Sequence, residues 1–276
     1  MAFLRLDAHQ YAYVLFVLVA FTRCSQPWQE SEKILQPEVV EINDLDEIAS
    51  IKDTIVDPIL YRNISGLNNL TVEENKQKFI AIVLPAILVA KYQLDTTCKE
   101  LKALQSKEQW NEYDSTFFLE QMTRFDARSL DGLLIRLKTH PTSIVIAQAA
   151  VESGWGTSRF FGKANNLFGI WSYHSNEPRI AASVKTNGAT TYLRKYENIS
   201  ASILDYFETI ARSRPYRHFR AMRAKTNDVN ELLPLLRNYS SRKGEYVDQL
   251  KTIIDQNNLT QYDLHRLNPA FFIEMD

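Results

Sequence analysis

The sequence predicts a mainly helical α+β protein with one small β insertion. After residue 71, apolar residues recur at steps of three and four over most of the chain, as they do on the buried face of an α-helix. Between residues 168 and 196 this spacing stops, and short β-prone runs flank the segment 185–188. That segment contains Asn187-Gly188, and an Asn-Gly pair between such runs is a strong hairpin signal.

The composition is that of an ordinary globular protein and excludes several function classes. Lys and Arg number 32 against 33 Asp and Glu, so the chain has no net positive charge to attract a nucleic acid, and we expect no such partner. The two cysteines, Cys24 and Cys98, exclude a framework of several disulfides. No Cys/His cluster has the spacing of a metal site, so we expect neither metal nor cofactor.

Residues 1–24 have the pattern of an export signal. Arg5 precedes an apolar run of about eleven residues from Tyr11 to Phe21, whereas a bilayer span needs roughly 20. Cys24 follows three residues after Phe21, which leaves a lipid anchor open beside a retained membrane anchor or a buried helix. We expect an exported protein of the periplasm or cell envelope, whose N-terminus could associate with a membrane.

Residues 25–57 mix charges with prolines and show no sustained period, which is typical of a linker. Helical spacing begins at Thr71, where Glu73 and Glu74 suit the positive end of a helix dipole. The apolar run 79–90 is short and contains Pro85, so it indicates a kinked core helix rather than a membrane crossing. We therefore expect an N-terminal helical extension over residues 58–129.

Further helices are predicted by the same apolar spacing on both sides of the β insertion. They cover residues 94–108, 115–138 and 142–152 before it, and 199–213, 216–225, 228–238 and 244–257 after it. The arginines between 212 and 223 are predicted to form a solvated helix face. The main domain then spans residues 130–264, and residues 265–276 form a C-terminal tail.

Glu152 is the residue most suited to chemistry. It is the single carboxylate of a helix that is small and apolar on nearly all sides, which Thr142 or Ser143 can begin and Gly154 can end. Desolvation and the negative end of the helix dipole both disfavour its charge, so its pKa should be raised. A protonated carboxyl can donate its proton to a leaving sugar oxygen. The alternative is a structural carboxylate paired with an arginine such as Arg159.

Two motifs carry a family resemblance. Residues 147–156, AQAAVESGWG, and residues 164–170, ANNLFGI, together resemble the signature of the bacterial glucosaminidase domain, a branch of the lysozyme-like superfamily. Residues 239–250 further resemble its Bax-like subgroup. The resemblance covers about residues 130–264 and implies a lysozyme-like helical domain with Glu152 as general acid. It also implies hydrolysis of the β-1,4 bond of N-acetylglucosamine in peptidoglycan glycan strands, without a cofactor.

The resemblance also nominates residues around Glu152. It implies that Asn166, Phe168 and Gly169 shape the floor where the β insertion leaves the helical body. Several aromatic residues could offer faces to sugar rings, although each alone is more often a core residue: Trp155, Phe168, Trp171, Tyr173 and Tyr192.

The second catalytic group is less clear. Glu177 is the only carboxylate between Glu152 and Glu197, so it is the candidate for activating water, although residues 176–178 are typical of an exposed turn. Tyr216 and then Tyr206 match the positions at which the family places aromatic hydroxyls facing the cleft. Attack by the substrate's own N-acetyl group is an alternative to a second carboxylate.

Two other functions remain open. In a lytic transglycosylase one glutamate serves as both acid and base, and the products differ from those of hydrolysis. A catalytically silent peptidoglycan-binding or scaffold protein would bind the wall and release no product.

Overall fold

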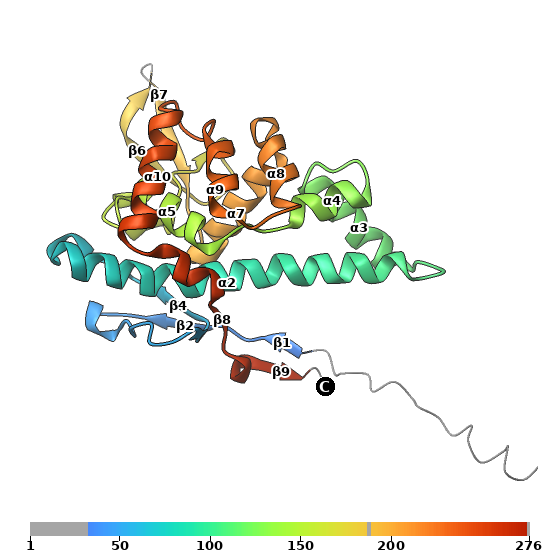
Figure 1. Cartoon of the computed structure of the whole chain (residues 1–276), viewed down its shortest axis with the longest axis horizontal. Helices are drawn as coiled ribbons and strands as arrows, with labels where there is room; N and C mark the ends of the chain where they lie inside the picture. The colour runs from blue at the N-terminus through green and yellow to red at the C-terminus, as the bar shows by residue number, and fades with distance from the viewer. Residues whose placement is uncertain (1–32, 187–188, 275–276) are drawn as a thin grey trace, which may run out of the picture. The chain divides into compact units, whose positions relative to one another are not determined.

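The computed structural model describes residues 33–186 and 189–274 (Figure 1). The export signal predicted at residues 1–24 lies outside the described residues. The chain divides into two compact units, of which the larger spans Leu35–Phe272. The described residues of the smaller unit are 33–34 and 273–274, which belong to the paired strands β1 (Lys33–Leu35) and β9 (Phe272–Glu274), and Lys33 lies 4.0 Å from the Glu274 carboxylate.

One long helix, α2 (Val72–Gln105), runs through the larger unit. Thr71 and Glu74 form a reciprocal capping box at its start, and residues 79–90 are buried. Within the described part of the chain it is the one helix long and apolar enough to cross a membrane, but 72% of its most apolar window is buried in the protein. This burial agrees with the predicted core helix. The separate helix expected at 94–108 is instead the second half of α2.

The remaining helices gather around the same hydrophobic core, so the predicted mainly helical class is confirmed. Their bounds are α3 (Glu112–Arg124), α4 (Leu130–Leu137), α5 (Thr142–Ser153), α6 (Arg159–Ala164), α7 (Ile199–Arg212), α8 (Arg217–Arg223), α9 (Val229–Leu232) and α10 (Gly244–Gln256). Short 3-10 segments are η1 (Leu45–Glu47), η2 (Leu67–Asn69), η3 (Arg214–Tyr216), η4 (Leu233–Leu236), η5 (Leu259–Leu264) and η6 (Pro269–Phe271). The single helix expected over 115–138 is divided into α3 and α4, with Asp126 between them at a φ of 49°.

The predicted β insertion is a three-stranded antiparallel sheet in the order β5-β7-β6. Its strands are β5 (Trp171–Ser172), β6 (Arg179–Thr186) and β7 (Ala189–Arg194). Thr186 pairs with Ala189, as the predicted hairpin requires, while the predicted turn at Asn187-Gly188 lies outside the described residues. The β6–β7 hairpin lies at the upper left in Figure 1.

The predicted linker at 25–57 is wrong from residue 35 onward. Strands β2 (Glu38–Glu41) and β4 (Ile59–Arg62) pair in parallel, and β3 (Ile55–Val56) pairs in parallel with β8 (Arg266–Leu267). Ile42, Ile48 and Val56 are buried in the common core. Residues 265–272 of the predicted C-terminal tail also belong to the larger unit, through β8. Strands of two to four residues are too short to show a hydrophobic period, which is why the sequence pattern missed them.

Candidate active site

Helix α5 carries Glu152; a distant segment caps its start, and glycines with positive φ follow its end. At its start, the Asp263 carboxylate of η5 accepts hydrogen bonds from the Ser143 backbone N–H (2.7 Å) and hydroxyl (2.8 Å), so a distant residue supplies the N-terminal cap. At its end, Gly154 has a left-handed φ of 58°. Two residues later Gly156 has a φ of 78°, and a Cβ there would lie 2.8 Å from the Leu67 side chain.

Glu152 is exposed to solvent in the last turn of this helix, yet nearby protein desolvates it. That desolvation raises the pKa of the Glu152 carboxyl above its ordinary value, while a hydrogen bond from Tyr246 and the charge of Arg242 oppose the rise. This direction matches the sequence prediction. Arg159 instead donates to the Ala181 carbonyl at 2.6 Å, and no salt bridge in the described chain involves Glu152.

Aromatic rings pack beside Glu152 in a group that we call the tyrosine cluster: Phe168, Tyr206, Tyr216, Tyr239 and Tyr246. Phe168 stacks on Tyr206 with centroids 4.2 Å apart, and Tyr239 stacks on Tyr246 at 5.6 Å. Tyr239 also contacts Tyr206 and Tyr216, at 6.2 and 6.1 Å. Neither of two hollows elsewhere on the molecule, of about 380 and 350 Å³, includes a member of the tyrosine cluster.

A buried glutamine joins the hydroxyls of this cluster. Gln148 lies on α5 one turn before Glu152 and is 0% exposed. Its Oε1 accepts from the Tyr206 hydroxyl at 2.5 Å, and its Nε2 donates to the Tyr246 hydroxyl at 3.1 Å. Tyr206 is also 2.8 Å from His140 Nε2. The environment of Glu152 is therefore a hydrogen-bonded network and not a purely apolar wall.

The two tyrosines nominated from the sequence lie near Glu152 in different settings. Tyr216 is 8% exposed, and desolvation together with the charge of Glu152 raises its pKa to about 12, so its hydroxyl keeps its proton. Tyr206 is 1% exposed and its hydroxyl is bonded to Gln148 and His140. The expectation that Tyr206 faces the cleft therefore does not hold, because its hydroxyl is occupied inside the core.

The residues expected to shape the floor lie at the junction of helices and β lobe. The Asn166 side chain is 1% exposed and donates to the carbonyls of Ile170 and Arg194, both at 2.9 Å, while accepting from the Ile170 N–H. It fixes the turn that leads into β5. Gly169, with a φ of 66°, faces open space where a Cβ would meet no atom within 4 Å.

The aromatic residues expected to bind sugar divide into two groups. Trp155 is half-buried against α2, with its ring 5.5 Å from Phe79 and with Lys76 Nζ 5.3 Å from the ring centroid. Trp171 and Tyr173 are 47% and 77% exposed at β5 and the loop after it, and their rings lie 6.5 Å apart at 22°. The exposed pair offers a stacking surface, whereas Trp155 is engaged in packing.

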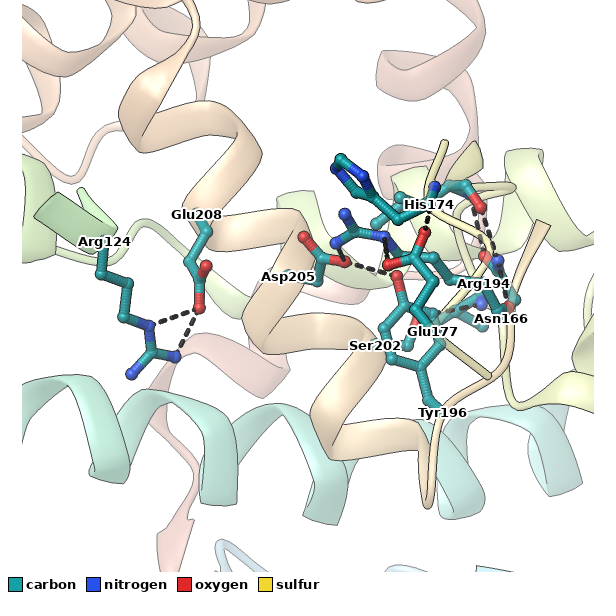
Figure 2. A network of polar contacts seen from close by, with 11 residues as sticks. Arg124, Asn166, His174, Glu177, Arg194, Tyr196, Ser202, Asp205 and Glu208 are labelled. Atoms are coloured by element: carbon teal, nitrogen blue, oxygen red, sulfur yellow. Dashed lines mark hydrogen bonds and ion pairs between the residues drawn. The ribbon is translucent and has the colours of Figure 1, made fainter. Parts of the chain in front are cut away.

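Glu177 is held by a polar network at the base of the β lobe (Figure 2). Arg194 Nε lies 3.2 Å from its carboxylate, while Arg194 Nη1 lies 2.6 Å from the Asp205 carboxylate of α7. Desolvation acts to raise the pKa of Glu177, but hydrogen bonds from Ser172 and the His174 N–H and the charges of Arg194 and His174 outweigh it and lower the pKa. Glu177 is therefore an ion-paired carboxylate.

Sequence reasoning missed four residues near the site: Gln148, Tyr246, His140 and Arg223. All four are buried, and Arg223 lies in the stretch predicted as a solvated helix face. Arg223 and Arg220 correct that prediction, since both are buried and bonded to backbone carbonyls. The available signal was the four-residue spacing of Gln148 and Glu152, which places two polar side chains on one face of an apolar helix.

A known protein family matches the part of the chain that contains Glu152 and the tyrosine cluster. The family model described as mannosyl-glycoprotein endo-beta-N-acetylglucosaminidase, the Glucosaminidase family, matches residues 132–259. These residues form a glucosaminidase domain. The glucosaminidase domain contains α5, the β lobe and the whole tyrosine cluster, and its bounds lie within five residues of the predicted 130–264 at each end.

The similarity to two curated relatives covers more of the chain than the glucosaminidase domain. Exo-glucosaminidase LytG of Bacillus subtilis is 26% identical over 68% of this chain and 66% of its own length. Protein bax of Escherichia coli is 25% identical over 66% of this chain and 69% of its own length, in agreement with the predicted subgroup. Among solved structures, the catalytic domain of the autolysin Auto from Listeria monocytogenes covers 59% of this chain and 94% of its own, at 24% identity and a TM-score of 0.39.

Proposed function

We propose that this chain is a peptidoglycan hydrolase that cleaves the β-1,4 bond of N-acetylglucosamine, with Glu152 as the general acid. The observation that carries the proposal is a solvent-exposed carboxyl whose pKa is raised, at the end of a buried helix inside the glucosaminidase domain. Such a carboxyl stays protonated to higher pH than an ordinary glutamate and can transfer its proton to the leaving oxygen as the glycosidic bond breaks.

The surrounding residues fit this proton transfer. When Glu152 loses its proton, the Tyr246 hydroxyl donates to the new carboxylate, a charge-assisted bond stronger than a neutral one. Tyr216 keeps its proton and can donate a hydrogen bond to the reacting sugar. The exposed Trp171 and Tyr173 supply stacking faces for sugar rings further along the strand.

The proposed routes differ in the group that attacks the sugar carbon. Glu177 is ionised, as a base for water must be, but Arg194 shares its charge and weakens it as a base. This ion pair favours routes in which Glu152 is the one active carboxyl. Attack by the substrate's N-acetyl group and lytic transglycosylation are such routes. Hydrolysis leaves a reducing glucosamine end, whereas transglycosylation leaves an anhydro-muramic end, so the products distinguish them.

The proposed substrate lies outside the cytoplasm, so the protein would act there. Peptidoglycan is assembled there, and the predicted export signal at residues 1–24 would deliver the chain to the periplasm or cell envelope. We propose internal cleavage of glycan strands, as in the description of the matched family, while the relative from Bacillus subtilis is named an exo-enzyme. The size distribution of the released fragments distinguishes these modes.

Glu152→Gln tests the proposal on purified peptidoglycan, with released fragments identified by mass spectrometry. Loss of the transferable proton should lower the rate by about 100-fold or more. The matched control is Glu245→Gln, which changes an exposed glutamate of α10 and should leave the rate unchanged. Full activity in Glu152→Gln would overturn the acid assignment, and binding to the wall without any product would favour the scaffold function.

A further inference from the structure

A continuous chain of hydrogen bonds runs through the core from Arg223 to Glu152. Its links are Arg223 Nη1 to His140 Nδ1 (3.5 Å), His140 Nε2 to the Tyr206 hydroxyl (2.8 Å), Tyr206 to Gln148 Oε1 (2.5 Å), Gln148 Nε2 to the Tyr246 hydroxyl (3.1 Å), and Tyr246 to the Glu152 carboxyl. The five residues before Glu152 are 0–2% exposed. Glu152 is the only member that reaches solvent.

The chemistry of each group fixes the direction of this chain. A guanidinium has donors only, so the Nδ1 of His140 must accept and its Nε2 must carry the proton. Burial, with the charges of Arg223 and Lys91, lowers the pKa of His140 well below its ordinary value, which keeps the ring neutral in that form. His140 therefore donates to Tyr206, and Tyr206 in turn donates to the Gln148 carbonyl oxygen.

The last two links extend the same direction to the candidate acid. The Gln148 amide nitrogen donates to the Tyr246 oxygen, and Glu152 is the one acceptor that the described residues offer to the Tyr246 hydroxyl hydrogen. Every donor in the chain thus points toward Glu152. The oxygen of the Glu152 carboxyl that accepts from Tyr246 is favoured as the carbonyl oxygen, because the carbonyl oxygen of a neutral carboxyl is the better acceptor, and the transferable proton is then favoured on the other oxygen.

Arg223 is unusual for a residue that only packs. Its side chain is 0% exposed, its Nε has no hydrogen-bond partner, and it forms no salt bridge with a carboxylate among the described residues. A buried charge without a counter-charge costs stability, and an apolar side chain of similar volume would fill the space at lower cost. Uncompensated burial of this kind is common at functional sites.

We propose that Arg223, His140, Tyr206, Gln148 and Tyr246 act as positioning residues that set on which oxygen Glu152 holds its proton and stabilise the carboxylate that remains after transfer. The inference rests on the proposed function, since it assigns Glu152 as the acid. It adds that the buried charge of Arg223 controls the acidity of Glu152. This control acts through the hydrogen bonds that lead from Arg223 to Tyr246.

Titration of Glu152 by carbon NMR tests this proposal without any activity assay. In protein labelled with ¹³C at the glutamate carboxyls, Glu152→Gln identifies the signal. The charged and titratable groups that face Glu152 are Tyr246, with Arg242 just before it, then Tyr216 of η3, Tyr206 of α7 and Tyr239 after η4. Tyr246→Phe removes the donor and should raise the Glu152 pKa by about one unit.

Tyr206→Phe removes the hydrogen bond to Gln148, the third link before Glu152, and should raise the Glu152 pKa by less than Tyr246→Phe does. Tyr239→Phe is the matched control. It removes a hydroxyl of the tyrosine cluster that takes no part in the hydrogen-bonded path from Arg223 to Glu152. A purely structural role would lower the melting temperature of Tyr206→Phe and leave the Glu152 titration unchanged, and that result in folded protein would overturn the proposal. If Tyr206→Phe does not fold, Gln148→Met serves as the second variant. It has a side chain of similar volume but loses the hydrogen bonds to Tyr206 and Tyr246.

The rate on soluble glycan fragments gives the second measurement. In Tyr246→Phe and Tyr206→Phe the alkaline limb of the kcat profile should move to higher pH, with kcat reduced by about ten-fold in Tyr246→Phe. If wild-type protein cleaves no glycan, the proposed function fails while the NMR titration still decides whether the chain controls Glu152. If the rates fall but neither the titration nor the pH profile moves, the positioning role is wrong and the glycosidase function stands.

Discussion

At the residue scale, opposing effects set the acidity of Glu152. Desolvation favours the protonated carboxyl, and Tyr246 and Arg242 favour the carboxylate. This balance keeps the group protonated to higher pH than an ordinary glutamate, yet allows the carboxylate to form as the proton leaves.

Arg242→Gln tests the weaker of these effects. Removing the positive charge should raise the Glu152 pKa further, so the carboxyl stays protonated to higher pH and the alkaline limb of the rate profile moves up. Because Arg242 is exposed, the shift should be largest at low salt and shrink as ionic strength rises. Rate–pH profiles at two salt concentrations check both expectations, and a shift toward lower pH would contradict them.

How much of the site the sequence could predict depends on the range of the interactions. Glu152 was predictable because its environment is local, namely an apolar helix that ends at Gly154. Tyr246 was not, because its bond to Gln148 joins residues 98 positions apart. Buried polar side chains resemble surface ones in a sequence, and Arg223 was misassigned for that reason.

At the element scale, α5 depends on a cap supplied from outside it. Pro141 precedes the helix without a side-chain hydrogen bond, and Asp263 of η5 fills that role for Ser143. Elements with long apolar faces, such as α7 and α10, were predicted nearly to the residue. Strands β2–β4 were not, because their partners and not their own patterns define them.

Asp263→Ala should cost about 1–2 kcal/mol in the free energy of unfolding, because two donors at the start of α5 lose their acceptor. Denaturant unfolding measures this loss. Asp248→Ala is the matched control, since it removes an exposed carboxylate of α10 and should change stability by less than about 0.5 kcal/mol. Equal stability of the two variants would show that the cap contributes nothing.

At the scale of the whole molecule, the glucosaminidase domain does not stand apart from the residues around it. Helix α2 contributes its buried face to the same hydrophobic core as α5 and α7. The N-terminal segment and the C-terminal residues meet through β3 and β8, and Asn268 Nδ2 donates to the Asp57 carboxylate at 2.6 Å. Residues 35–57 of the predicted linker and 265–272 of the predicted tail are thus parts of one folded unit, joined by contacts between residues more than 200 positions apart.

Truncation at the C-terminus tests this integration. Removing residues 265–276 deletes β8 and the Asn268 contacts, which leaves the β3 backbone groups without partners and should lower the melting temperature by several degrees. Removing only residues 273–276, of which the structure describes Ile273 and Glu274 in the smaller unit, leaves β8 in place and should change the melting temperature little. Thermal unfolding of both chains beside the full-length protein provides the measurement. If the chain without residues 265–276 has the same melting temperature as the full-length protein, β8 contributes no stability and residues 265–276 are a dispensable tail.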